Sequence, residues 1–271
     1  MPLDVFALLL RFMLYAGTIL AAGSVALRFS LAVNRGGGFD RMLRLQTGFG
    51  LAAVLLASLA LIAKFLLTIS GGDWAMAFSA EFIGIALQTP VGQSGLVRIV
   101  AACVLAVTLL AGWRWLAFIA AFGLLLSFGL EGHSMSYGIR LVSMVLVVVH
   151  VMIVSWWLAV LLPLMASPVP ERDAMGHAFG QRAVFAVPLL MIAGALLLGT
   201  FTGWNIDLSQ DYQRNMLLKL FAVSGLLLIA AANKLYFTGK PAFIWALRVE
   251  TLVAAIVLIL TTLLTATGPD M

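Results

Sequence analysis

The sequence predicts an all-α membrane protein, a bundle of about eight transmembrane helices. Of its 271 residues, 63% are hydrophobic and only 10% are charged, and the mean hydropathy is +1.11. A soluble domain would carry about 25% charged residues. A helix needs roughly 20 mostly apolar residues to cross bilayer hydrocarbon about 30 Å thick. We therefore expect one transmembrane domain over residues 1–271, embedded in the lipid bilayer.

Eight apolar runs use up nearly the whole chain, and clusters rich in Gly, Pro and polar residues separate them. Such clusters predict turns, because Gly permits positive φ and Pro cannot continue a helix. Only the short turn at residues 111–114 divides the third run from the fourth. The expected spans are residues 5–33, 43–69, 95–112, 113–133, 138–165, 179–203, 214–237 and 243–267.

The charges of alternate loops differ in sign, which predicts the orientation. One set of loops is basic and carries Arg35, Arg41, Arg44, Arg114, Arg172, Lys234 and Lys240. The other set is mostly acidic and carries Asp4, Asp73, Glu81, Glu131, Asp207, Asp211 and Asp270. Cytoplasmic loops of membrane proteins are rich in Lys and Arg. We expect a bacterial inner-membrane protein with both termini in the periplasm. Topology then explains the net charge of +5, so no nucleic-acid partner is expected.

Sequence motifs for common soluble chemistry are absent. The chain has no Walker motif, Gly-rich dinucleotide loop, Cys-x-x-Cys pair or Ser/His/Asp set at credible spacing. Without these motifs or a soluble domain, ATP-driven pumping by this chain alone is excluded.

Three histidines are the strongest candidates for function. His150 lies inside the fifth apolar run, where an ionisable group is costly and indicates a functional site. His133 ends the fourth run on the outer side, and His177 lies in a polar cytoplasmic segment. Helical spacing places Ser143 and Trp157 on the same face as His150. We expect His150 to be functional and His177 to be solvated. His133 and His150 can bind one metal ion only if their difference in depth is removed; otherwise they are successive stations or the ends of a larger ligand.

Methionine adds one further candidate ligand. Thioether and imidazole ligands suit Cu(I), but most of the 12 methionines are explained as core residues. Met135 differs because it lies two residues after His133 in a polar outer segment. We expect Met135 to join the histidines as a copper ligand.

Four cations lie within the apolar runs near the outer face, where basic residues should be few: Arg11, Lys64, Arg98 and Lys219. Snorkelling explains one such residue, whereas four suggest an anionic partner in or near the bundle. Glu250 is the one clearly intramembrane carboxylate, and Arg248 is its neighbour in sequence. So few acids argue against transport of Mg²⁺ or Ca²⁺, which prefer oxygen ligands.

Several of these residues together resemble the CopD family of bacterial copper-resistance membrane proteins. Gly132-His133, and His150 followed seven residues later by Trp157, are similar to the family's Gly-His and His…Trp-Leu-Gly motifs. Here Ala159 stands in place of the motif's glycine. Further along, Lys219, the Asn233-Lys234 pair and Glu250 are similar to the family's Lys, Asn-Arg and Glu positions. The resemblance covers about residues 85–267.

The resemblance implies an inner-membrane protein of eight helices that transports or handles copper, with a small periplasmic copper carrier as partner. His133 and His150 carry over as ligands, whereas Met135 rests on its chemistry alone. Distant relatives of this bundle resemble haem proteins, so a haem b-binding membrane protein, such as an oxidoreductase, stays open as the alternative. Buried His would then bind the iron, and Arg11, Arg98 and Lys219 would pair with the haem propionates.

Overall fold

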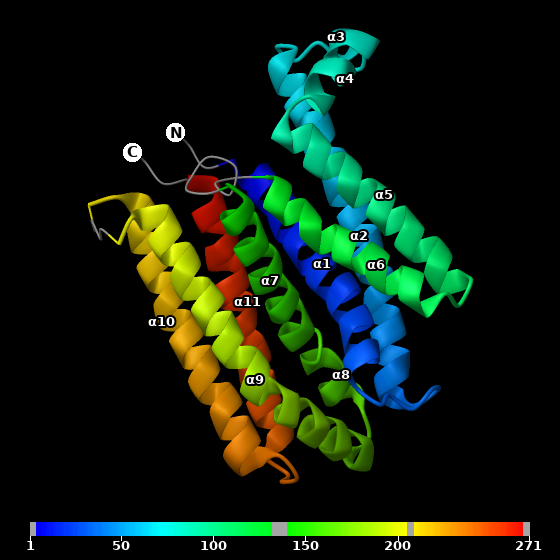
Figure 1. Ribbon diagram of the computed structural model, residues 1–271, viewed down its shortest axis with the longest axis vertical. Coiled ribbons are helices and arrows are strands. Elements are labelled where there is room, and N and C mark those ends of the chain that lie inside the picture. Colours follow the sequence, from blue (N-terminus) through cyan, green and yellow to red (C-terminus); the bar gives the residue numbers. More distant parts are fainter. Residues whose placement is uncertain (1–3, 132–139, 205–208, 268–271) are drawn as a thin grey trace.

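In the computed structural model, all regular secondary structure of the described residues is helical. The model describes residues 4–131, 140–204 and 209–267, and the side chain of Asp211 is outside that description. Figure 1 shows long helices packed side by side. The helices are α1 (Val5–Ser30), α2 (Gly38–Ile69), α3 (Trp74–Ala77), α4 (Ala80–Leu87), α5 (Pro90–Leu110), α6 (Arg114–Leu126), α7 (Arg140–Leu158), α8 (Leu161–Ala166), α9 (Val169–Thr202), α10 (Asp211–Ala232) and α11 (Phe243–Thr267).

Short non-α turns extend two of these helices. The 3₁₀ turn η1 (Ser127–Leu130) continues α6, and the π-helical turn η3 (Asn233–Phe237) continues α10. Among the described residues, seven helices are long and apolar enough to cross a membrane, and Arg114–Leu130 forms a shorter eighth apolar helix. Its 17 residues would extend about 26 Å at 1.5 Å per residue. The prediction of a polytopic all-α membrane protein is confirmed.

Three helices begin earlier than the hydropathy indicates. Their first turns, which begin at Gly38, Pro90 and Val169, are polar or charged and were expected to be loops. A polar turn can still be helical where a cap satisfies its free N–H groups. At α5, the Thr89 side chain accepts from the Gly92 N–H, and Pro90 occupies the first turn. The short helices α3 and α4 were not expected.

The bundle has two halves that share α1 and α7. Helices α2, α5 and α6 lie on one side, and α9, α10 and α11 lie on the other (Figure 1). One apolar core fills the first half, where Ala102, Leu105 and Leu124 are fully buried. A second core includes Trp156, Trp157 and Leu247. The second half contains His150 and the intramembrane carboxylate Glu250.

Polar contacts join the helices at the end where α1 meets α2. Asp40 forms ion pairs with Arg28 and Arg44, each at 2.9 Å. Deeper in the bundle, the Gln46 amide donates to Ser24 Oγ at 2.6 Å and to the Ala159 carbonyl at 2.8 Å. These contacts connect α1, α2 and the end of α7.

The loops with the basic residues lie at one end of the bundle. In Figure 1 the α1–α2, α8–α9 and α10–α11 connections are at the lower end. The α5–α6 turn belongs to the same end, because the Trp115 ring lies 5.1 Å from that of Phe29 near the end of α1. The opposite end holds the beginning of α1, the end of α11 and the α3–α4 segment.

This segregation gives a direct test of orientation with single cysteines in a Cys103→Ser background. Met76 in α3 and Lys240 before α11 are both exposed, at opposite ends. We expect a membrane-impermeant maleimide to label Met76→Cys in intact cells, and Lys240→Cys only after the membrane is permeabilised. Labelling of both sites from the same side would refute the eight-span arrangement, and the reverse pattern would refute periplasmic termini.

Candidate functional site

His150 is half-buried in the second half of the bundle, on α7 and facing Gly194 of α9. It is ten residues after Arg140, which is about 15 Å along the helix axis. Gly194 leaves space for the ring, because a Cβ there would lie 3.4 Å from Cε1 and 3.6 Å from Nδ1. Nδ1 is buried without a hydrogen-bond partner among the described residues. In the tautomer that carries its proton on Nε2, the Nδ1 lone pair is free to bind a ligand.

Lys219 of α10 is the charged neighbour of His150. It lies close enough for its charge to act on the imidazole. Within the described part of the chain, Lys219 makes no hydrogen bond or ion pair. If copper occupies this site, the outer cations are expected to point away from it. Lys219 does not follow that expectation, and any cation bound by Nδ1 would feel its charge.

A second polar group, here called the Glu250 cluster, consists of Trp157, Asn233 and Glu250. Trp157 Nε1 donates to Glu250 Oε1 at 3.0 Å, and Asn233 Nδ2 donates to Glu250 Oε2 at 2.5 Å. Asn233 and Glu250 are 5% and 3% exposed. Arg248, the neighbour in sequence, instead stacks on Trp245 with 4.5 Å between the guanidinium carbon and the ring centroid.

The two sites follow one another along the same helix. Trp157 is seven residues beyond His150 on α7, about 10 Å further toward the basic end. The positions that resembled the family's motifs in the second half of the chain therefore form two adjacent polar sites. Ala159, which replaces the motif's glycine, is fully buried. It packs so closely on Gly23 of α1 that a Cβ there would lie 2.6 Å from the Ala159 Cβ.

Near the end of the bundle opposite the basic loops, four residues form what we call the Arg98 cluster: Ser94, Arg98, Ser127 and Glu131. Arg98 is 3% exposed and forms an ion pair with Glu131. Its Nε donates to Ser127 Oγ at 3.0 Å, and Ser94 Oγ donates to Glu131 Oε2 at 3.1 Å. The cluster joins α5 to the end of α6, immediately before residue 132.

Two of the other three cations, Lys64 and Arg11, also have partners within the protein. Lys64 forms an ion pair with Asp4 at 2.8 Å, and its hydrogen bond lowers the pKa of the Asp4 carboxyl below the ordinary value. Arg11 Nη1 donates to the Thr265 carbonyl at 2.8 Å. The anionic partner that four cations suggested is therefore supplied by the chain itself for Lys64 and Arg98.

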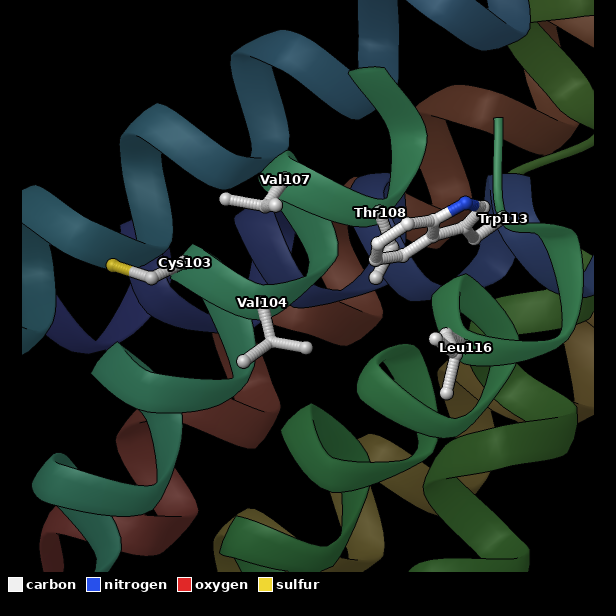
Figure 2. Close-up of a pocket in the computed structure, with 6 residues that line it drawn as sticks. All are labelled: Cys103, Val104, Val107, Thr108, Trp113 and Leu116. Atoms are coloured by element: carbon white, nitrogen blue, oxygen red, sulfur yellow. The ribbon is translucent and has the colours of Figure 1, made fainter. Parts of the chain in front are cut away.

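These positions give the haem hypothesis no support. Arg11, Arg98 and Lys219 were expected to pair with propionates, but Arg98 already has a carboxylate and Lys219 lies beside His150. Two hollows of the described structure, one on the α5–α6 hairpin and one beside Glu250, have no histidine in their lining. One of them, of about 320 Å³, is apolar and lies on the α5–α6 hairpin around Cys103 and Trp113 (Figure 2).

Two of the candidate ligands, His133 and Met135, lie outside the described residues. His177 is exposed on α9, in agreement with its expected solvation. Within residues 4–131, 140–204 and 209–267, no group of three or more His, Cys, Asp or Glu side chains could hold a metal ion.

The Arg98 cluster makes a prediction about stability. In Glu131→Gln the buried Arg98 loses its countercharge, and breaking a buried ion pair costs roughly 3–5 kcal/mol. The Glu131 side chain is 33% exposed, so we expect the lower end, about 3 kcal/mol. Asp4→Asn, which breaks the exposed pair with Lys64, should leave the thermal unfolding midpoint in detergent nearly unchanged. Equal midpoints for the two variants would contradict this assignment.

One comparison with known proteins gave a match. The family model described as "Copper resistance protein D-like, N-terminal domain" matches residues 2–141. No curated protein and no solved structure matches the chain significantly. The match covers α1, α2, α5, α6 and the Arg98 cluster, while His150 and the Glu250 cluster lie beyond it. Because it spans more than half of the 271 residues, the chain belongs to the copper resistance protein D-like family, and its function is related to copper resistance.

Proposed function

We propose that this protein transports or handles copper at the bacterial inner membrane, with His150 as the ligand inside the bilayer. The observation that carries the proposal is the buried, unpartnered Nδ1 of His150. Imidazole is a suitable ligand for copper, and a neutral imidazole needs no charge compensation within hydrocarbon. Membership of the copper resistance family supports copper, rather than another metal, as the cargo.

Copper would enter from the outer side in this proposal. His133 and Met135 would capture Cu(I), because imidazole and thioether are soft, neutral ligands. A small periplasmic carrier would deliver the ion, which requires that this end faces the periplasm. Ion-pairing of Glu131 with Arg98 anchors the chain just before these ligands, so the Arg98 cluster would position the outer site without binding metal.

Lys219 would keep the affinity of His150 low. Two unit charges 4 Å apart repel by roughly 4 kcal/mol at an effective dielectric constant of about 20, and the repulsion falls as the separation grows. An ion that crosses a membrane must bind strongly enough to enter but weakly enough to leave. A single imidazole beside a cation meets both conditions. Its lone pair binds the ion, and the positive charge of Lys219 weakens that binding.

Replacement of His150 tests the proposal. His150→Ala should abolish copper accumulation by cells, and intramembrane Cu(I) binding by the purified protein should be lost in a competition assay with a chromogenic chelator. His177→Ala is the matched control, because His177 is exposed on α9, and it should remain near wild type. Equal effects of the two substitutions, or none from His150→Ala, would refute the assignment.

Lys219 distinguishes copper from haem. Lys219→Gln removes the repulsion between the lysine and a copper ion at His150, so copper accumulation should be unchanged or slightly raised. The control Lys64→Gln should behave in the same way. A haem protein would instead be red with a Soret band, and its haem occupancy would fall in Lys219→Gln through loss of a charge-assisted hydrogen bond worth about 1.5–3 kcal/mol. A red protein whose haem occupancy falls in Lys219→Gln would overturn the copper proposal in favour of haem binding.

A further inference from the structure

A cavity of about 190 Å³ leads from the basic end of the bundle to the Glu250 cluster. Its lining comes from α7, α8, α9, α10 and α11, with Trp157 and Glu250 at the deep end and Lys234 and Thr238 near the loop. Lys234 is exposed. Water occupies about 30 Å³ per molecule in the liquid, so the volume admits roughly six waters. Most of the lining is apolar, and the polar side chains on it are Trp157, Asn233, Lys234, Thr238 and Glu250.

The carboxylate of Glu250 has no cationic partner among the described residues. Arg248 is turned to Trp245, and the Lys234 side chain runs along Gly180 at the exposed end of the cavity. No titratable side chain of α7, α8 or α9 lines the cavity within the part of the chain described. An unpaired charge within hydrocarbon is expensive, so the neutral, protonated form of this carboxyl is favoured by its surroundings.

Asn233 is placed to stabilise that protonated form. Its amide lies 2.5 Å from Glu250 Oε2, within hydrogen-bond distance. Its Oδ1 atom is buried and has no partner in the described structure. The nitrogen and oxygen of an asparagine amide exchange places by a half-turn. After that half-turn, Oδ1 would accept the hydrogen of a protonated Glu250, and Nδ2 would take the buried position that Oδ1 holds now.

The backbone around Asn233 is also unusual. Asn233 begins the π-helical turn η3, and its carbonyl accepts both from the Thr238 N–H at 2.9 Å and from Thr238 Oγ1 at 2.8 Å. Such π turns within helices occur often at functional sites. Here the turn directs the Asn233 side chain toward Glu250 while Thr238 remains on the cavity wall.

We propose that Glu250 binds and releases a proton, with Asn233 as the acceptor of the carboxyl O–H and the cavity as the water route from the basic end. A hydronium in the cavity gives its proton to Oε2 and leaves water behind, and release reverses this transfer. Trp157 remains bonded to Oε1 in both states. Use of this proton to drive copper rests on the function proposed above, whereas the proton site itself does not.

Infrared spectroscopy of the full-length protein, titrated with pH in detergent, tests the site without copper. A protonated carboxyl group has a carbonyl stretch that the carboxylate lacks. Wild type should show such a band that disappears at high pH. Glu250→Gln should lose the band, and Glu81→Gln, which changes an exposed acid, should keep it. A titration with no band assignable to Glu250 would overturn the proposal.

Trp157→Phe keeps the carboxyl and tests the site in a second way if Glu250→Gln does not fold. The substitution removes the indole donor from Oε1, so the carbonyl band should move to higher frequency. An unmoved band would place the titrating carboxyl elsewhere in the protein and overturn the assignment.

Proteoliposomes with an internal pH dye test the coupling to copper. Addition of Cu(I) to wild type should change the internal pH, and Glu250→Gln should abolish that change while Glu81→Gln keeps it. Copper movement without a pH change would overturn the coupling. If no copper moves but the infrared band is present, the proposed copper function fails and the proton site at Glu250 stands. If copper moves but the band is absent, the copper function stands and the proton site fails.

Discussion

Every polar group inside a bilayer must find its partner within the protein, since hydrocarbon offers none. Most of the fold follows from that constraint. Arg98 is stabilised by Glu131 and Ser127, Gln46 by Ser24 and Ala159, and Glu250 by Trp157 and Asn233. Each group joins two or more helices, so the polar contacts help to determine which apolar faces meet.

The exceptions to this constraint occur in both halves of the bundle. In the described structure Gln46 Oε1 and Ser58 Oγ of α2 are buried without a partner, and so are His150 Nδ1 and Asn233 Oδ1. The last two differ because they lie beside ionisable groups, Lys219 and Glu250. In the other half, the buried charges of Asp40 and Arg98 are held in ion pairs.

The spans were predictable because hydropathy depends only on local composition. The first residues of three helices were harder to predict, because the first turns of α2, α5 and α9 are polar yet helical. Thr89 followed by Pro90 is a helix-start signal that would have given the correct beginning of α5. For α9, the residues before Phe179 carry so many charges that composition alone indicates a loop.

That His150 lies within a membrane-spanning helix could be predicted, because it is an ionisable residue inside a long apolar run. Its neighbours could not, because Lys219 and Gly194 come from helices whose packing the sequence does not specify. For the same reason Glu250 was associated with Arg248, two residues away, when its partners come from α7 and η3. Sequence indicates which residues are costly to bury, and only the packing shows which of them are left without partners.

X-ray absorption at the copper edge of the Cu(I)-loaded protein tests the central claim most directly, because it reports the atoms bound to the metal. The account predicts scattering from an imidazole ring in wild type that is reduced or lost in His150→Ala and kept in His177→Ala. Identical spectra for wild type and His150→Ala would contradict the assignment of His150 as the intramembrane copper ligand.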